Sequence, residues 1–364
     1  MPNIAYYISS HGYGHAARQQ AVINQLARRG VAVHVRTATP PKFFQSARSL
    51  HHARYDIGMI QADALHFDIP ASLQWMVDFL DAQAPLIAQE VAFLHVQKID
   101  LVVSDMPAIA CEIAERAGVP SVVVTHFTWD WVYAHYSADY PQAEPIVEAL
   151  RAQYSQATLA LQMQIPYPHP FDAFPTVEPV GLIHNPATRT REAVRAEFNI
   201  PPDQALVLLS MGGHRWGHSN IQTLKQQTGA VFLVMPDAWE QVSDHPERFR
   251  PVPMDYPAYH NLIAAADVLV GKAGGSTVAE VIGHRTPMIY TTQHAAQWRE
   301  SELLARTLTD HASAHYVPLN DFIAGHWVDD LPNVLHADHH WSDIARDGAS
   351  QTAARLLQLI TDGC

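Results

Sequence analysis

The sequence predicts an α/β protein built from two Rossmann-like, doubly wound domains. Apolar strand-like runs alternate with amphipathic helical stretches in both halves of the chain, which is typical of parallel sheets covered by helices. A glycine-bracketed segment near each end, 11–18 and 271–280, follows a strand and opens a helix. The 364 residues exceed one ordinary core at about 150 residues per domain. We therefore expect two domains that face each other across a cleft.

The first half begins with an apolar run that ends in a glycine turn. Small and aliphatic residues then recur at helical spacing until Gly30. The same strand, turn and helix order appears again before residue 125. The expected elements are the strand 4–9, the helix 16–29, the strands 31–35 and 100–103, the helix 107–117 and the strand 121–124.

The second half repeats the alternation after a proline-rich stretch. Its expected elements are the strand 205–210, a helix that ends at residue 228, the strand 231–234, the helix 259–266, the strand 267–270, the helix 276–283 and the strand 288–290. Ligands of doubly wound sheets bind at the carboxyl ends of the strands. The loops at these ends are therefore the places to look for a site.

The proline-rich stretch 165–180 is predicted to be the interdomain linker, because its prolines do not fit a central strand or a helix interior. This assigns residues 1–164 to an N-terminal domain and residues 181–345 to a C-terminal domain. Residues 346–364 contain an amphipathic segment, 351–360, that is expected to pack back onto the N-terminal domain.

Charge and hydropathy exclude several classes of partner. A formal net charge of -13 opposes non-specific binding to nucleic acid or to an anionic membrane. The N-terminus lacks a basic leader, and no segment reaches the roughly 18 apolar residues of a membrane span. We expect a cytoplasmic protein without stable membrane insertion.

Cysteine and histidine usage predicts no metal site. The two cysteines, Cys111 and Cys364, exclude a disulfide framework and a cysteine zinc site. His336, His339 and His340 form a local cluster, but no carboxylate motif of metal-binding spacing surrounds them, which favours a solvated loop.

The pattern of residues 271–280 predicts a segment that binds a diphosphate. Its glycines allow a ligand to approach the backbone, and the helix that follows offers unpaired N–H groups and a partial positive charge. Lys272 adds a cation. The alternative is an ordinary glycine turn that caps a helix.

The segment 11–18 carries histidines and so has the character of a catalytic turn. At a helix start the dipole favours a neutral His15, whose lone pair is then available as a general base. His11 is the rival base, or contacts acceptor or donor phosphate. Asp105 stands at a strand end, where it either orients the histidine or caps the next helix.

Two further loops follow strand ends. The segment 125–133 is dense in aromatic rings, which suit a sugar or apolar acceptor, although a hydrophobic patch packed on a neighbouring helix is an equal alternative. The segment 211–218 contains Gly212, Gly213, His214 and Arg215, which suit donor phosphates. A surface turn is its alternative.

The stretch 264–290, with its Gly-Gly-Ser-Thr turn and Glu280, resembles the donor region of the GT-B superfamily of glycosyltransferases. It is most similar to the branch of peptidoglycan N-acetylglucosaminyl transferases and diacylglycerol glycosyltransferases. The His-Gly-Tyr-Gly-His-Ala-Ala-Arg segment is similar to the opening of the glycosyltransferase-like domain of arabinokinases. The resemblance covers both halves in the correct order and implies a GT-B fold, in which residues 1–164 form the acceptor-binding domain and residues 181–345 form the nucleotide-sugar-binding domain.

The resemblance also implies site residues. Asp105 would orient His15, the base. The residues implied to hold the donor are Gly14, Gly212, Gly213, His214, Arg215, Lys272, Gly274, Gly275, Ser276, Thr277, Glu280, Gln293, His294, Gln297 and Glu300. The residues expected to hold the acceptor are Tyr13, His126, Trp129, Asp130 and Trp131. The family's common Asp-Gln pair is missing from the loop 291–302, so the donor sugar stays open.

The reaction implied is inverting transfer of a hexose or N-acetylhexosamine from a nucleotide-diphosphate sugar, as in UDP-sugars, to a hydroxyl or amine. No Asp-x-Asp motif stands in a suitable loop, so we expect no metal and no cofactor. Two alternatives fit the same scaffold: a sugar-nucleotide 2-epimerase, which needs further acidic residues, and a non-catalytic sugar-nucleotide-binding protein.

Overall fold

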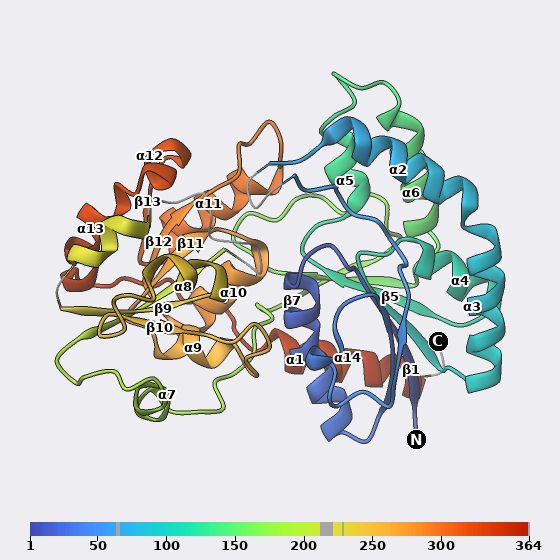
Figure 1. The fold of residues 1–364 in the computed structure, drawn as a ribbon. Helices are drawn as coiled ribbons and strands as arrows, with labels where there is room; N and C mark the ends of the chain where they lie inside the picture. Colours follow the sequence, from blue (N-terminus) through green and yellow to red (C-terminus); the bar gives the residue numbers. More distant parts are fainter. Residues whose placement is uncertain (63–65, 212–220, 228, 363–364) are drawn as a thin grey trace. The chain divides into compact units, whose positions relative to one another are not determined.

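A computed structural model describes residues 1–62, 66–211, 221–227 and 229–362 of the chain. The chain divides into two compact units. Unit 1 comprises residues 1–60, 67–184 and 344–364, and unit 2 comprises residues 61–66 and 185–343. Each unit is built around one parallel sheet (Figure 1).

Unit 1 contains seven parallel strands in the order β3-β2-β1-β4-β5-β6-β7. The central strands are buried along their whole length, which explains why they read as continuous apolar runs. The strands are β1 (Asn3–Ile8), β2 (Ala32–Thr37), β3 (Ser49–His52), β4 (Leu101–Asp105), β5 (Ser121–Thr125), β6 (Leu159–Met163) and β7 (Val177–Val180).

Helices cover both faces of this sheet. α3, α4 and α6 form one layer, and α1 and α14 lie against each other in another (Figure 1). The helices of unit 1 are α1 (Gly14–Arg28), α2 (Ile69–Ala82), α3 (Ala84–Gln97), α4 (Ile109–Ala117), α5 (Trp129–Ala134), α6 (Ala143–Tyr154), α14 (Gly348–Asp362) and the short 3₁₀ helix η1 (Pro41–Phe43).

The proline-rich stretch 165–180 differs from the expected linker. It lies within unit 1, and its last residues form the edge strand β7 beside β6. An edge strand tolerates Pro179, because one side of the strand needs no hydrogen-bond donor. The chain passes into unit 2 between His184 and Asn185.

The last helix, α14, belongs to unit 1. It lies against α1, where the Arg29 guanidinium donates to Ser350 Oγ at 2.9 Å. It also reaches β7 through Arg355, whose Nε and NH2 atoms each donate to a Glu178 carboxylate oxygen at 2.7 Å. The end of the chain thus covers the first helix and the sheet edge of unit 1.

Unit 2 repeats the architecture with six parallel strands in the order β10-β9-β8-β11-β12-β13. The strands are β8 (Ala205–Ser210), β9 (Ala230–Val234), β10 (Phe249–Pro251), β11 (Val268–Lys272), β12 (Met288–Thr291) and β13 (Ala314–Tyr316). The helices are α7 (Arg191–Glu197), α8 (Pro236–Val242), α9 (His260–Ala265), α10 (Gly275–His284), α11 (Glu300–His311), α12 (Leu319–Ala324), α13 (Trp327–His336) and the 3₁₀ helix η2 (Ile221–Gln226).

The two sheets share one winding pattern, in which strand order reverses once. The reversal lies between β1 and β4 in unit 1 and between β8 and β11 in unit 2. Loops diverge at such switch points and leave room for a ligand at the carboxyl ends of the strands. α1 follows β1, and α10 follows β11, so each glycine-bracketed segment opens at the switch point of its own sheet.

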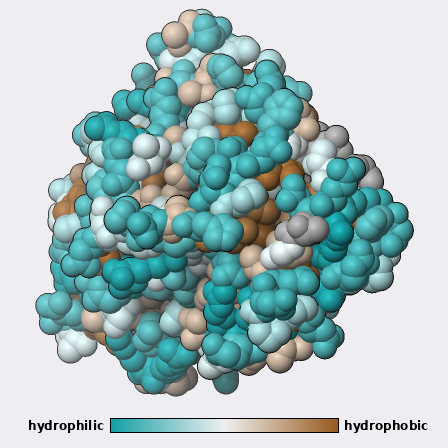
Figure 2. Space-filling model, turned by 90° about the vertical axis from the view of Figure 1, so that its left-hand side faces the viewer, coloured by the Kyte–Doolittle hydropathy of each residue, from teal (hydrophilic) through white to brown (hydrophobic). Residues whose placement is uncertain are grey.

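The surface is mainly polar on the face drawn in Figure 2, where hydrophobic side chains form smaller areas among hydrophilic ones. Within the residues that the structure describes, no helix is both long enough and apolar enough to cross a membrane.

Candidate functional site

The turn between β1 and α1 brings the N-terminal histidines to the end of β4. The Ser9 N–H donates to the carbonyl of Asp105 at 3.0 Å, which ties the turn to β4. Gly12 adopts a φ of 74°, a conformation that costs glycine little, and α1 then begins at Gly14. His15 therefore stands on the first turn of α1, facing the strand end.

His15 is paired with Asp105, which is one of the two arrangements that the sequence leaves open for this aspartate. Its Nδ1 lies 3.2 Å from Asp105 Oδ1, and both side chains are buried. Asp105 does not cap the following helix, since the N-cap residue of α4 is Ala108. Of the two roles considered for this aspartate, the contact is the one that orients the histidine.

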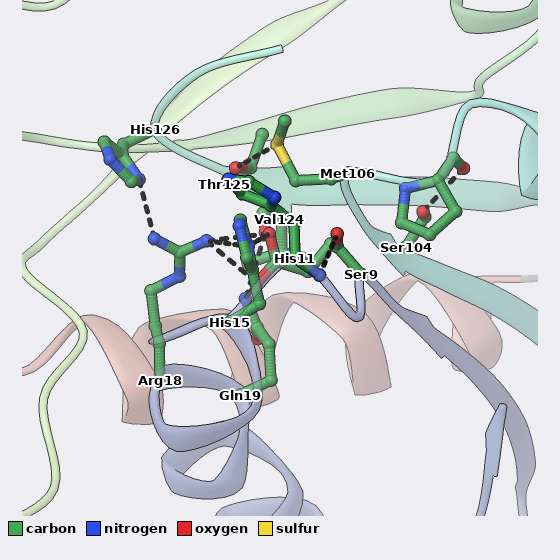
Figure 3. A network of polar contacts seen from close by, with 12 residues as sticks. Ser9, His11, His15, Arg18, Gln19, Ser104, Met106, Val124, Thr125 and His126 are labelled. Atoms are coloured by element: carbon green, nitrogen blue, oxygen red, sulfur yellow. Dashed lines mark hydrogen bonds and ion pairs between the residues drawn. The ribbon is translucent and has the colours of Figure 1, made fainter. Parts of the chain in front are cut away.

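Arg18, which the sequence analysis did not single out, joins the same group (Figure 3). Its NH2 atom lies 2.7 and 2.8 Å from the two Asp105 oxygens and 3.1 Å from His15 Nδ1. Its NH1 atom lies 2.6 Å from Nδ1 of His126. The spacing of three residues between His15 and Arg18 on a helix places both on one face, and this is the signal that was available in the sequence.

The remaining capacity of Asp105 is filled by Gln19. The Gln19 amide donates to Asp105 Oδ2 at 2.8 Å and to the Val124 carbonyl at 3.1 Å, and its oxygen accepts from the Tyr6 hydroxyl at 2.5 Å. Burial alone would raise the pKa of the Asp105 carboxyl. The Arg18 guanidinium, followed by the neighbouring His15, outweighs burial and holds the pKa of Asp105 well below its usual range. Asp105 is thus an anion across the physiological range.

His11 lies apart from this group and contacts the loop that follows β3. The N–H of Met59 donates to His11 Nδ1 at 3.3 Å, and the ring lies edge-on to Trp129 with centroids 5.3 Å apart. A Cβ at Gly58 would come within 2.6 Å of His11 Nδ1, so only glycine fits there. Because Nδ1 accepts this bond, its lone pair is already used, which favours His15 over His11 as the base.

The aromatic segment after β5 does not present Trp129 to an acceptor. Trp129 has no exposed surface, and its indole N–H donates to Asp56 at 2.9 Å. The expectation for Trp129 is therefore corrected: a large apolar ring gains more from burial in the core of unit 1 than from exposure. Asp130 is also buried and lies 3.1 Å from the Nε of Arg151.

The other residues expected to hold an acceptor have mixed surroundings. His126 is buried against Arg18. Trp131 is half-buried and stacks on His169 with ring centroids 4.3 Å apart. Tyr13 is the N-cap residue of α1, beside Gly14, and its ring lies near Phe43. The structure gathers these residues around the start of α1 and the end of β5.

Asp56 is a buried carboxyl that the sequence analysis did not identify. Burial raises its pKa, and the hydrogen bond from Trp129 only partly offsets that effect. Nothing in the local sequence signals this environment, because the contact joins residues 73 positions apart. Unit 1 therefore holds two buried aspartates whose pKa values move in opposite directions.

The start of α10 in unit 2 contains small residues. Gly274 is its N-cap residue, and Gly275, Ser276 and Thr277 form the first turn, which no side chain caps within the described residues. Among the described residues, a Cβ at Gly274 would meet no atom within 4 Å, so these residues leave space beside the N-cap of the helix. Lys272 ends β11 just before it. An open helix start beside a lysine suits an anion.

Glu280 has two protein partners in unit 2. The main-chain N–H and the side-chain amide of Asn185 each donate to Glu280 Oε1 at 3.0 Å, and His284 Nε2 lies 3.1 Å from Oε2. Burial would raise the pKa of Glu280, but the bonds from His284 and Asn185 lower it below its usual value. An ionised Glu280 keeps acceptor capacity for further hydroxyl groups.

The donor-binding candidates in the loop after β12 differ in how far they are buried. Gln293 and Glu300 are buried, and Glu300 accepts from the Trp298 indole at 2.9 Å. Gln297 is half-buried and His294 is exposed. The remaining donor candidates, Gly212, Gly213, His214 and Arg215, lie outside the described residues.

Among the residues that the structure describes, no group of three or more histidine, cysteine, aspartate or glutamate side chains is arranged to hold a metal ion. Two members of the C-terminal histidine cluster have other partners. His336 Nδ1 lies 2.7 Å from the Pro332 carbonyl, and His339 Nδ1 lies 2.7 Å from Ser313 Oγ.

The chain is similar in sequence to one part of a larger protein. Comparison with known protein families finds no match. The L-arabinokinase of Arabidopsis thaliana is 33% identical over 363 residues, which make up 97% of this chain and 34% of that protein. The chain thus spans about a third of the length of the curated relative that it matches.

Solved structures share the fold over the whole chain. A UDP-glucosyltransferase from Polygonum tinctorium has a TM-score of 0.60 and 14% identity, with 100% of this chain and 94% of that chain covered. MurG of Acinetobacter baumannii has a TM-score of 0.55 and 14% identity, with both chains fully covered. The resemblance to these glycosyltransferases and to arabinokinase is confirmed, and the chain has the GT-B fold.

Proposed function

We propose that the chain is an inverting, metal-independent glycosyltransferase. It moves a hexosyl or N-acetylhexosaminyl group from a nucleotide-diphosphate sugar, of the UDP-sugar class, to a hydroxyl or amine of a small-molecule, lipid or glycan acceptor. One observation carries the proposal: the buried imidazole of His15 is paired with the ionised carboxylate of Asp105 at the switch point of a GT-B sheet.

Unit 1 supplies the base in this proposal. His15 takes the proton of the acceptor group on Nε2, and Asp105 stabilises the imidazolium that forms. The acceptor oxygen or nitrogen bonds to the anomeric carbon while the bond from that carbon to the diphosphate breaks. Attack from the opposite face inverts the anomeric centre, and charge develops on the sugar as in an oxocarbenium ion.

Unit 2 supplies the donor site. In this proposal the N–H groups at the start of α10 and the ammonium of Lys272, the last residue of β11, stabilise the negative charge that the leaving diphosphate gains. Glu280 accepts hydrogen bonds from the ribose hydroxyls, as the resemblance implies. Gln293, His294, Gln297 and Glu300 follow β12 and are the candidates for contact with the sugar.

The test is incubation of the chain with a panel of nucleotide sugars, with and without a pool of acceptors, followed by product analysis. The proposal predicts nucleoside diphosphate release and a glycosylated acceptor of inverted configuration. Conversion of the donor sugar without acceptor would instead indicate a 2-epimerase. Donor-protected melting with neither transfer nor hydrolysis would indicate a non-catalytic binding protein.

A further inference from the structure

The Arg18 guanidinium contacts both histidines near the end of β4. It is almost completely buried, with 2% of its surface exposed. Figure 3 shows it between His126 on one side and the group formed by His15 and the end of β4 on the other. These contacts are with ionisable or tautomeric groups, so the protonation pattern of the site depends on Arg18.

The contact with His126 has one chemical interpretation. Arginine carries only donors, and it stays protonated in proteins. The 2.6 Å contact between Arg18 NH1 and His126 Nδ1 is therefore a hydrogen bond that Nδ1 accepts. A neutral imidazole that accepts on Nδ1 carries its proton on Nε2. His126 is thereby fixed in the Nε2–H tautomer.

His15 Nδ1 lies between two groups that require opposite tautomers. Arg18 NH2, at 3.1 Å, can only donate to it, and the ionised Asp105 Oδ1, at 3.2 Å, can only accept from it. NH2 lies closer to both Asp105 oxygens, at 2.7 and 2.8 Å. These shorter, charge-assisted bonds engage the NH2 hydrogens. The proton on His15 Nδ1 then faces Asp105, and the lone pair lies on Nε2.

We propose that Arg18 is a positioning residue: it fixes His126 in the Nε2–H tautomer, and it holds Asp105 in the place where that carboxylate accepts the Nδ1 proton of His15. The tautomers themselves do not depend on the proposed function. The inference rests on that function in one respect, which is that the His15 lone pair accepts a proton from the substrate. Arg18 acts through Asp105 and His126.

The experiment measures the tautomers directly. Long-range ¹H–¹⁵N correlation spectra of the full chain, with ¹⁵N-labelled histidine, separate protonated from unprotonated ring nitrogens. The spectra are recorded above the pH range in which histidine titrates. His15→Gln and His126→Gln variants assign the signals. The test variant is Arg18→Lys, which keeps the charge but loses the planar fork that reaches three partners.

A matched control comes from the same sheet. Arg36 on β2 is also buried and pairs with a buried carboxylate, since its Nε lies 2.8 Å from Glu90 Oε2. Arg36→Lys disturbs a buried ion pair of the same kind without contact to either histidine. If Arg18→Lys does not fold, the double variant Arg18→Met/Asp105→Asn removes both buried charges together, and the His126 tautomer is then the only quantity read from it.

The expected wild-type spectrum shows Nδ1–H for His15 and Nε2–H for His126. Arg18→Lys is expected to turn His126 into a mixture of tautomers and to lower kcat about 10-fold to 100-fold with little change in donor KM. Arg36→Lys should keep both tautomers. The inference is overturned if the wild type shows either histidine in the other tautomer, or if His126 keeps a single Nε2–H tautomer without Arg18. If the tautomers respond as expected and no glycosyl transfer occurs, the proposed function fails and the inference stands.

Discussion

The N-termini of α1 and α10 occupy equivalent positions in their sheets but carry different side chains. Each follows a central parallel strand and opens at the switch point of a sheet. At α1 the space is filled by His15, Arg18 and the carboxylate of Asp105. At α10 the first turn holds small residues, and a Cβ at Gly274 would meet no atom of the described residues within 4 Å. A helix start crowded with ionisable side chains suits proton transfer, whereas a bare one offers its main chain to an anion.

Two glycines near the start of α10 have different surroundings: Gly271 is packed against a neighbouring strand, whereas the described residues leave space beside Gly274. Substitution of Gly271 gives the largest expected effect on stability. A Cβ at Gly271 would lie 1.7 Å from the Ser210 carbonyl oxygen of the neighbouring strand. Gly271→Ala should therefore lower the free energy of unfolding of unit 2 by more than about 4 kcal/mol. Gly274→Ala should cost only about 0.5–1 kcal/mol, because its added Cβ meets no atom of the described residues and the loss is limited to the preference for glycine over alanine at the N-cap. Urea denaturation of both variants makes the comparison, and similar midpoints would contradict it.

The side-chain chemistry at α1 predicts the next largest effect. Asp105→Asn leaves the buried Arg18 charge without its anion and should lower the free energy of unfolding by about 3–5 kcal/mol near neutral pH. The pKa of Asp105 is lowered in the folded chain, so its contribution is present above the unfolded pKa of about 3.9. It is lost as the pH falls through the folded value. Urea denaturation of wild type and variant at a series of pH values should show their stabilities converging in acid.

His15→Ala tests the catalytic use of the same helix start. Removal of the general base should lower kcat by about 10²-fold or more while the donor KM changes little. Steady-state kinetics with an identified donor and acceptor pair measures this, and thermal melting serves as the control for folding. His11→Gln should reduce kcat less, because the His11 Nδ1 lone pair is engaged by Met59. A variant without His15 that turns over normally would reject the assignment.

The smallest effect concerns the second buried aspartate of unit 1. Burial raises the pKa of Asp56, so its contribution to stability is present below the unfolded pKa and is lost as the pH rises through the folded value. Asp56→Asn keeps an acceptor for the Trp129 indole and should raise the free energy of unfolding at neutral pH by on the order of 1 kcal/mol. The gain should shrink as the pH falls, and a gain that grows in acid would contradict this explanation.

The sequence predicted the parts of the molecule that local patterns encode. Both β-turn-α openings, Asp105 at a strand end and the alternation of strands and helices follow from periodicity and glycine placement. The contacts between distant segments did not follow. Arg18 and His126 are 108 residues apart, and Asn185 and Glu280 are 95 apart, so only folding brings them together.

Two other expectations differ from the structure because tertiary packing overrode composition. The stretch 165–180 looked like a linker because of its prolines, yet an edge position lets β7 include Pro179. Trp129 looked like part of an acceptor wall because its segment is aromatic, yet Asp56 draws its indole inward. Both depend on a partner that lies elsewhere in the chain.

The central claim is that the start of α1 transfers a proton and the start of α10 binds the diphosphate. Calorimetric titration of UDP into the His15→Ala and Gly274→Val variants tests this claim most directly. The account predicts that His15→Ala binds UDP as tightly as the wild type, because the base does not hold the diphosphate. Gly274→Val should bind at least about 10-fold more weakly, a loss of about 1.4 kcal/mol, because its side chain occupies the approach to α10. Unchanged UDP binding by Gly274→Val, or weakened binding by a folded His15→Ala, would contradict it.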